Sequence, residues 1–197
     1  PLSDWLYSIY KKDKKIKIIG LSGGQGAGKS TITKILKFIF KKKYNLNICC
    51  FSIDDFYKTK LERIKMSQKV HKLFLTRGVP GTHDLNLLLK TIQQLKKKKF
   101  KTVLIPRFDK ASDDRLKKNK WQKIRKRPDI IIFEGWCIGA KNQKSNELKH
   151  PLNYIEKKYD KKLIWRKTAN NFLKNQYKKL FEKIDKLVYL KAPNFNN

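Results

Sequence analysis

Cysteines are few in this sequence, and long apolar runs are absent from it. The 197 residues contain three cysteines, Cys49, Cys50 and Cys137, too few for a disulfide framework, and the adjacent pair has no matching His/Cys group to complete a zinc site. No apolar run approaches the roughly 20 residues that a membrane-spanning helix requires, and the N-terminus lacks the order of regions found in a signal peptide. We therefore expect a cytoplasmic protein in a reducing compartment, without a membrane span.

Acidic residues are also scarce, with 16 Asp and Glu against 49 Lys and Arg, which ordinarily suggests nucleic acid or an anionic membrane as a partner. Only 7 of the cations are Arg, the residue suited to base edges and bidentate phosphate contacts. Ala (5) is rare, whereas Ile (20) and Asn (13) are abundant, as an AT-biased genome would encode. The lysines are scattered and lack interleaved aromatic residues that could stack on bases. Genomic bias is therefore favoured over nucleic-acid binding, which stays open as the alternative.

The length of the chain fits one domain with a substantial core, and no obvious linker divides residues 1–197. Near the N-terminus, Leu2, Trp5, Leu6 and Ile9 form an apolar stripe with helical spacing. Such a stripe could lie on a membrane surface, but packing against the core is the favoured interpretation. Nothing in the composition predicts an oligomeric state.

A glycine-rich motif follows the apolar run 16–21 at the spacing of a strand-loop-helix unit. It fits the pattern G-x-x-x-x-G-K-[ST], in which backbone N–H groups converge on phosphate oxygens at the positive end of the next helix. Lys29 is expected to reach the β and γ phosphates, and Ser30 to place its hydroxyl on Mg²⁺. A chance match in a glycine-rich turn is the alternative, which the flanking pattern disfavours. The predicted nucleoside triphosphate site comprises Gly23, Gly24, Gln25, Gly26, Ala27, Gly28, Lys29, Ser30 and Thr31.

Apolar periodicity predicts strands that alternate with helices along the chain. The expected strands are 16–21, 48–53, 102–105, 129–133 and 187–190. The expected helices are 29–42, 59–75, a helix that begins after an Asp84 cap, and much of the last third. This alternation predicts an α/β fold of three layers, with a mostly parallel central sheet of about five strands flanked by helices, as in P-loop NTPases.

Carboxylates follow two of the expected strands and should meet the phosphate loop at one edge of the sheet. Glu134 has the place of a second Mg²⁺ carboxylate; the alternative is an ordinary strand-end acid, which the adjacent Gly135 disfavours because it permits close approach of a ligand. We interpret Asp54 as the base that orients an acceptor hydroxyl and as a further metal-site residue beside Ser30 and Glu134. Asp55 is interpreted as an N-cap or solvent-side neighbour, although the two could be exchanged. Adjacent residues of an extended segment point opposite ways, so only one should face the phosphate.

Loop residues at the same edge are candidates for binding the acceptor, and for each a turn or surface role is an equal alternative. His83 is expected to bond substrate or cap the next helix rather than to ligate a metal, because no second His lies at ligand spacing. The same loops contain Thr82, Arg107 and Lys110. The predicted acceptor site comprises Tyr57, Arg77, His83, Asp109, Arg115 and Trp136.

Taken together, five blocks of sequence resemble the P-loop kinases related to D-glycerate 3-kinase, a group near uridine kinase, phosphoribulokinase and pantothenate kinase. The blocks are SGGQGAGKST (22–31), SIDDFY (52–57), RGVPGTHD (77–84), PRFDK (106–110) and FEGWC (133–137). The resemblance spans nearly the whole chain and implies ATP as donor and a small hydroxylated metabolite as acceptor, with glycerate the first choice. It also implies that Asp54 acts on the acceptor hydroxyl and that Glu134 lies near Mg²⁺.

One departure from that group concerns the C-terminus. Relatives continue past the segment that resembles 190–195 into a lid helix with Arg and a further tail, so we expect this chain to be a fragment or a truncated product without that lid. Arg115 or Arg166 would be the substitutes for the lid cation. Two other functions stay open, namely a nucleotide-binding or nucleic-acid-associated ATPase and a decayed kinase.

Overall fold

Four parallel strands form the central sheet of the computed structural model, which describes residues 1–191. The strands are β1 (Lys17–Gly23), β2 (Ile48–Ser52), β7 (Ile130–Gly135) and β8 (Lys186–Leu190), in the order β2-β7-β1-β8. β1 and β7 are almost wholly buried, as expected of inner strands covered on both faces. The segment 192–197, which contains most of the sequence expected to precede a lid, lies outside the described residues.

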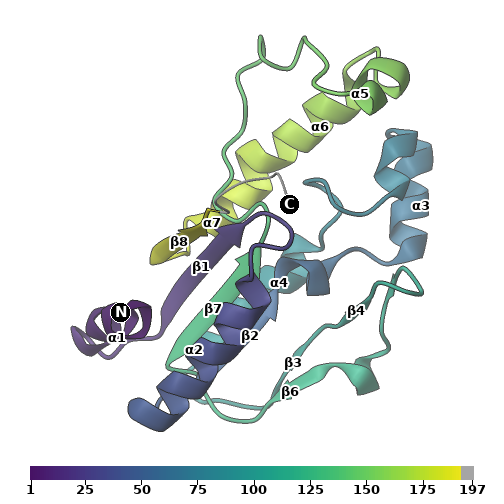
Figure 1. The fold of residues 1–197 in the computed structure, drawn as a ribbon. Helices are drawn as coiled ribbons and strands as arrows, with labels where there is room; N and C mark the ends of the chain where they lie inside the picture. The colour runs from purple at the N-terminus through teal and green to yellow at the C-terminus, as the bar shows by residue number, and fades with distance from the viewer. Residues whose placement is uncertain (192–197) are drawn as a thin grey trace.

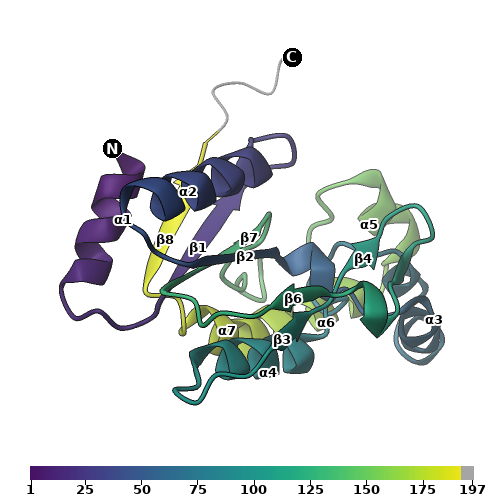
Figure 2. The ribbon, with the colours of Figure 1, turned by 90° about the horizontal axis from the view of Figure 1, so that it is seen from below.

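Helices cover both faces of this sheet, so that the molecule has three layers (Figures 1 and 2). On one face, α1 (Leu2–Lys11) and α2 (Lys29–Lys43) contribute Leu6, Leu36 and Phe40 to a buried cluster. On the other face pack α4 (Leu85–Lys96) and the continuous helical segment of α6 (Ile164–Phe172), a π-helical turn (Leu173–Tyr177) and α7 (Lys178–Phe181). The predicted α/β fold with a parallel sheet between helices is confirmed.

The expected strand at 102–105 does not join the central sheet. β3 (Val103–Ile105) pairs antiparallel with β6 (Gln122–Ile124), and β4 (Phe108–Asp109) pairs with β5 (Asp114–Arg115) in a small hairpin (Figure 1). A 3₁₀ turn (Lys118–Lys120) joins the two ribbons. Pro106 ends β3 after three residues, and its partner strand contains Lys123 and no apolar run, so the pairing left no signal in the sequence. Within residues 1–191 the central sheet therefore has four strands and not about five.

The helix expected over 59–75 ends early. α3 (Lys60–Lys69) begins at a capping box in which Thr59 accepts from the Glu62 N–H and Glu62 accepts from the Thr59 N–H. His71 then takes an extended conformation and caps a 3₁₀ turn (Lys72–Leu75) through its ring nitrogen, which separates the two segments. The predicted cap of α4 is confirmed, because Asp84 accepts from the Leu87 N–H at 3.0 Å.

The N-terminal stripe packs on the core through Leu2, Leu6 and Ile9. Leu6 of α1 is 1% exposed, whereas Trp5 remains 45% exposed. Among the helices of residues 1–191, none has both the length and the apolar composition that crossing a bilayer requires.

Candidate active site

The phosphate loop connects β1 to α2. Gly26 and Gly28 have φ values of 80° and 78°, a left-handed conformation that residues with a Cβ rarely adopt. The loop ends at the N-terminus of a 15-residue helix, where free backbone N–H groups and the helix dipole favour an anion. The Lys29 ammonium donates to the carbonyls of Gly23 at 2.9 Å and Gly24 at 2.7 Å, which keeps it over the loop. The loop therefore has the shape and donors that a triphosphate needs.

Ser30 and Glu134 meet at the carboxyl end of the sheet. The Ser30 hydroxyl donates to Glu134 Oε1 at 3.1 Å, because β7 lies beside β1 with Glu134 opposite Leu21. Burial raises the pKa of Glu134, while the Ser30 hydrogen bond and the Lys29 charge oppose that rise. Hydroxyl and carboxylate oxygens are the hard ligands that Mg²⁺ prefers, so this pair fits the metal. Residues 1–191 hold no group of three His, Cys, Asp or Glu side chains placed to bind a metal, so phosphate oxygens and water would complete the shell.

Asp54 and Asp55 lie on a 3₁₀ turn (Ile53–Phe56) directly after β2 and not on an extended segment. Asp55 closes a capping box by accepting from the Ser52 N–H at 3.3 Å, and burial raises the pKa of its carboxyl. Asp54 takes no part in the cap with its side chain, which instead pairs with the Lys110 ammonium at 3.1 Å. Both acids line the cavity, but their partners differ, because Asp55 is built into the turn and pairs with Arg107 at 3.4 Å, whereas Asp54 forms an ion pair only with Lys110 among residues 1–191.

All these groups line one cavity of about 880 Å³, which we call the phosphate-loop cavity. It brings together the ends of β1, β2, β7 and β8, the loop after the 3₁₀ turn 72–75 and the segment that contains the β4–β5 hairpin. Its walls are formed by Gly23, Gly24, Gln25, Gly26, Lys29, Ser30, Ser52, Asp54, Asp55, Tyr57, Arg77, Gly78, Arg107, Phe108, Lys110, Glu134, Gly135, Trp136 and Tyr189.

Residues 18–168 match the Phosphoribulokinase / Uridine kinase family over more than half of the chain. The chain belongs to this family. Its sequence is 33% identical over 189 residues to the uncharacterized kinase mug58 of Schizosaccharomyces pombe, covering 91% of this chain and 66% of that protein. It is 34% identical over 134 residues to the chloroplastic D-glycerate 3-kinase of Arabidopsis thaliana, covering 63% of this chain and 29% of the relative. The chain therefore spans less than two thirds of the length of these curated relatives.

A solved structure with a similar fold is the D-glycerate 3-kinase from Cryptococcus neoformans var. grubii. It superposes with a TM-score of 0.80 at 25% identity, covering 95% of this chain and 71% of that one. The expected resemblance to P-loop kinases of the D-glycerate 3-kinase and uridine kinase group is confirmed.

Three of the six residues predicted to bind an acceptor line the phosphate-loop cavity, namely Tyr57, Arg77 and Trp136. His83 does not, because it is 2% exposed behind Tyr57, with the two rings stacked at 4.3 Å. Its Nδ1 lies 2.5 Å from the Tyr177 hydroxyl, and burial lowers its pKa to about 3. His83 is therefore a buried support of the cavity wall and not an acceptor contact.

Asp109 and Arg115 also lie off the cavity wall. Asp109 accepts from the N–H groups of Ala111 and Ser112 and so holds the turn of the hairpin. Arg115 donates to the Tyr57 carbonyl at 2.7 Å and pairs with Asp84 at 3.3 Å, which ties the hairpin to the loop before α4. Both side chains therefore bond to protein groups that hold the segments around the cavity in place.

Eight cavity residues were outside the predicted site, although Arg107 and Lys110 were among the loop candidates: Arg107, Phe108, Lys110, Ser52, Asp55, Gly78, Gly135 and Tyr189. The first three belong to the block PRFDK, whose basic residues next to a strand end were the available signal. Tyr189 lies on β8 opposite Ser22 of β1, a relationship that only the sheet order reveals.

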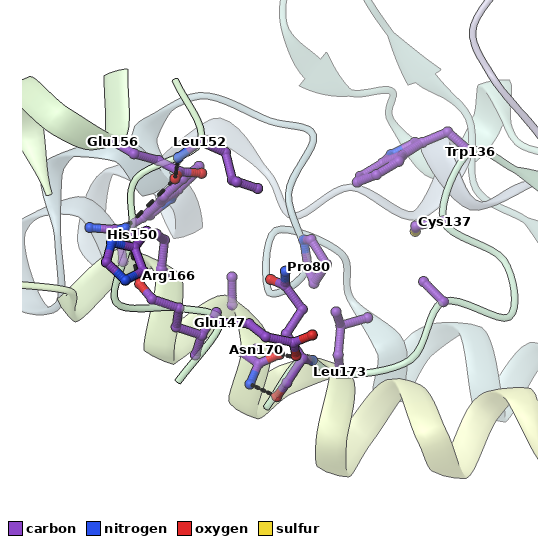
Figure 3. Close-up of a pocket in the computed structure, with 15 residues that line it drawn as sticks. Pro80, Trp136, Cys137, Glu147, His150, Leu152, Glu156, Arg166, Asn170 and Leu173 are labelled. Carbon is purple, nitrogen blue, oxygen red and sulfur yellow. Dashed lines mark hydrogen bonds and ion pairs between the residues drawn. The ribbon is translucent and has the colours of Figure 1, made fainter. Parts of the chain in front are cut away.

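A second cavity of about 370 Å³ lies beside the first and shares Trp136 with it (Figure 3). Trp136 lies at one end, and Arg166 of α6 lies at the other beside Glu156 of α5 (Tyr154–Tyr159). Arg166 is buried, donates to Asp160 Oδ2 and to the Leu148 carbonyl at 3.0 Å each, and does not line the phosphate-loop cavity. Neither Arg166 nor Arg115 is therefore placed to substitute for a lid cation.

Proposed function

We propose that this chain is an ATP-dependent kinase that transfers the γ-phosphoryl group to a hydroxyl of a small metabolite, with glycerate as the first acceptor to test. The main support for this proposal is that one cavity is lined by the Lys29 ammonium, the hydrogen-bonded pair Ser30–Glu134 and the Asp54 carboxylate. Phosphoryl transfer depends mainly on positioning and charge stabilisation, and these groups supply both.

In the proposed reaction, the backbone N–H groups of residues 23–30 and the Lys29 ammonium bind the triphosphate. Asp54 accepts the proton of the acceptor hydroxyl as its oxygen forms a bond to the γ-phosphorus, and the bond from that phosphorus to the β–γ bridging oxygen breaks to release ADP. Mg²⁺, held through Ser30 and Glu134, would neutralise charge on the phosphate oxygens. Lys110 lies beside the Asp54 carboxylate at 3.1 Å and holds it at the cavity wall.

The names of the relatives support glycerate only as the first acceptor to test. Those that carry the name D-glycerate 3-kinase are longer than this chain, and the mug58 relative has no acceptor in its name. We likewise propose that the protein acts in the cytoplasm. The three cysteines, which form no disulfide within residues 1–191, support a reducing compartment. The plant relative is chloroplastic by name, so microscopy of a tagged protein is the test of location.

The test of function is ATP consumption by the purified protein with glycerate, pantothenate, nucleosides and pentose phosphates, each with and without Mg²⁺. Turnover that requires one of these acceptors and yields its phosphorylated form supports the proposal. Hydrolysis stimulated by DNA or RNA instead would favour a nucleic-acid-associated ATPase. Tight ATP binding without turnover on any acceptor would favour a decayed kinase.

A further inference from the structure

A fully buried arginine and a cavity arginine share one carboxylate. Asp113 Oδ2 accepts from Arg63 Nη2 at 2.9 Å, and its Oδ1 accepts from Arg77 Nη1. The Arg63 side chain is 0% exposed, whereas Arg77 lines the phosphate-loop cavity. Asp113 thus connects α3 and the loop after the 3₁₀ turn 72–75 to the tip of the β4–β5 hairpin.

The backbone of Asp113 is held in an uncommon conformation at this point. Its φ is 54°, in the left-handed region that a residue with a Cβ enters at a cost. Arg63 Nη2 also bonds the Asp113 carbonyl at 2.5 Å, and Arg63 Nη1 bonds the Leu75 carbonyl at 2.7 Å. The buried guanidinium therefore fixes both the Asp113 side chain and its main chain. Backbone strain of this kind is concentrated near functional sites.

Phe108 fixes the cavity arginine from a second side. The guanidinium carbon of Arg77 lies 5.6 Å from the centroid of the Phe108 ring, and that of Arg63 lies 5.8 Å from it. Two guanidinium groups share one carboxylate, which leaves one positive charge unmatched, and Arg77 forms no other ion pair among residues 1–191. That charge lies on the wall that also carries Asp54.

We propose that Arg63 and Asp113 are positioning residues, which hold the Arg77 guanidinium on the cavity wall so that its remaining donors bind the phosphoryl acceptor. The inference rests on the proposed function, since it places the acceptor in this cavity. Neither Arg63 nor Asp113 lines the cavity, so both act through Arg77. A guanidinium that is already ordered loses less side-chain entropy on binding than a free one does.

The test compares Asp113→Asn with Asp114→Asn. Asp114 is its neighbour in the hairpin and accepts from the Lys60 N–H at 2.9 Å, but it forms no ion pair in the described part of the chain. Asp113→Asn should lower kcat/KM for the acceptor by about 10- to 100-fold while KM for ATP is unchanged, because a displaced positioning group affects only the acceptor. Asp114→Asn should behave as the wild type. In an Arg77→Ala background, Asp113→Asn should cause no further loss.

A second readout does not depend on turnover. The guanidinium signals of Arg77 in ¹⁵N–¹H NMR spectra should be dispersed in the wild type and in Asp114→Asn, and should move to the position of free arginine in Asp113→Asn. Equal kinetic losses in both variants, an undiminished loss in the Arg77→Ala background, or an unmoved Arg77 signal would overturn the proposal. If the wild type phosphorylates no acceptor, the proposed function fails, and the NMR comparison still decides whether Asp113 positions Arg77.

Discussion

The Ser30 hydroxyl and the Glu134 carboxylate form a hydrogen bond of 3.1 Å across the carboxyl ends of β1 and β7. This bond joins a residue of the phosphate loop to a residue 104 positions later, and it holds a hydroxyl oxygen and a carboxylate oxygen together at the carboxyl end of the sheet. The residue Glu134 is 9% exposed, and such a buried acid requires a compensating partner. In the proposed kinase that partner is Mg²⁺ bound to the triphosphate.

Glu134→Gln should therefore weaken ATP binding only when the metal is present. The amide retains the shape of the side chain and can still bond Ser30, but it has lost the charge, so affinity for ATP with Mg²⁺ should fall by about 10- to 100-fold. Affinity for ATP in EDTA should be unchanged. Calorimetric titration under both conditions checks this, with the exposed Glu182→Gln as control. Equal weakening in EDTA would mean that Glu134 acts on the loop and not on the metal.

The same substitution has a second consequence, for stability in the absence of nucleotide. Burial raises the pKa of Glu134 above the ordinary 4.5, so the folded chain holds this proton more strongly than the unfolded chain does. Stability then falls as pH rises from 4.5 through the raised pKa, because ionisation favours the unfolded state over that window. Glu134→Gln removes that decline.

The melting temperature of Glu134→Gln should thus exceed that of the wild type at pH 7 but match it near pH 4. Burial also raises the pKa of Asp55. Asp55 contributes the same pH dependence of stability to both proteins, so its contribution cancels in the comparison. Differential scanning calorimetry at the two pH values measures the difference. A constant difference at both values would show that the buried charge is not its cause.

The phosphate loop, the fold class and the polar strand ends follow from local sequence patterns. Glycines at 26 and 28 have the positive φ values that the motif requires, and Asp84 caps the helix that it precedes. These features depend on residues a few positions apart, for which spacing along the chain is a direct guide.

Features that depend on distant partners could not be predicted in the same way. The position of His83 is fixed by Tyr177, 94 residues later, so a polar residue in a loop motif became a buried one. Arg63 is the one fully buried residue of the largely polar helix α3, and nothing near it signals that Asp113, 50 residues later, is its partner. In both cases burial and ion pairing override what the local composition suggests.

Tyr177→Phe should change the protonated nitrogen of His83. The Tyr177 oxygen accepts from the Gly81 N–H at 3.1 Å and lies 2.5 Å from Nδ1 of His83. We expect its single hydrogen to be donated to Nδ1, which places the ring hydrogen on Nε2. Without the hydroxyl, the Gly81 N–H and the His83 Nδ1 both lose a partner, which should lower the free energy of unfolding by about 1–3 kcal/mol. Imidazole ¹⁵N shifts and urea unfolding check this.

The exposed Tyr154→Phe is the matched control for that substitution. It should alter neither the His83 spectrum nor the free energy of unfolding. If the spectrum of His83 is the same in Tyr177→Phe as in the wild type, the expected direction of the hydrogen bond between Tyr177 and His83 is wrong.

Asp54 is the central residue of the proposed reaction, and the decisive measurement is single-turnover phosphoryl transfer from ATP by Asp54→Asn. In the proposed reaction Mg²⁺ is held through Ser30 and Glu134, and the Asp54 carboxylate acts only on the acceptor proton. The rate should therefore fall by about 10²- to 10⁴-fold while the dissociation constant of ATP with Mg²⁺ is unchanged. Asp109→Asn, which alters an acid that holds a hairpin turn off the cavity wall, should keep the wild-type rate. Transfer at the wild-type rate by Asp54→Asn would contradict the account.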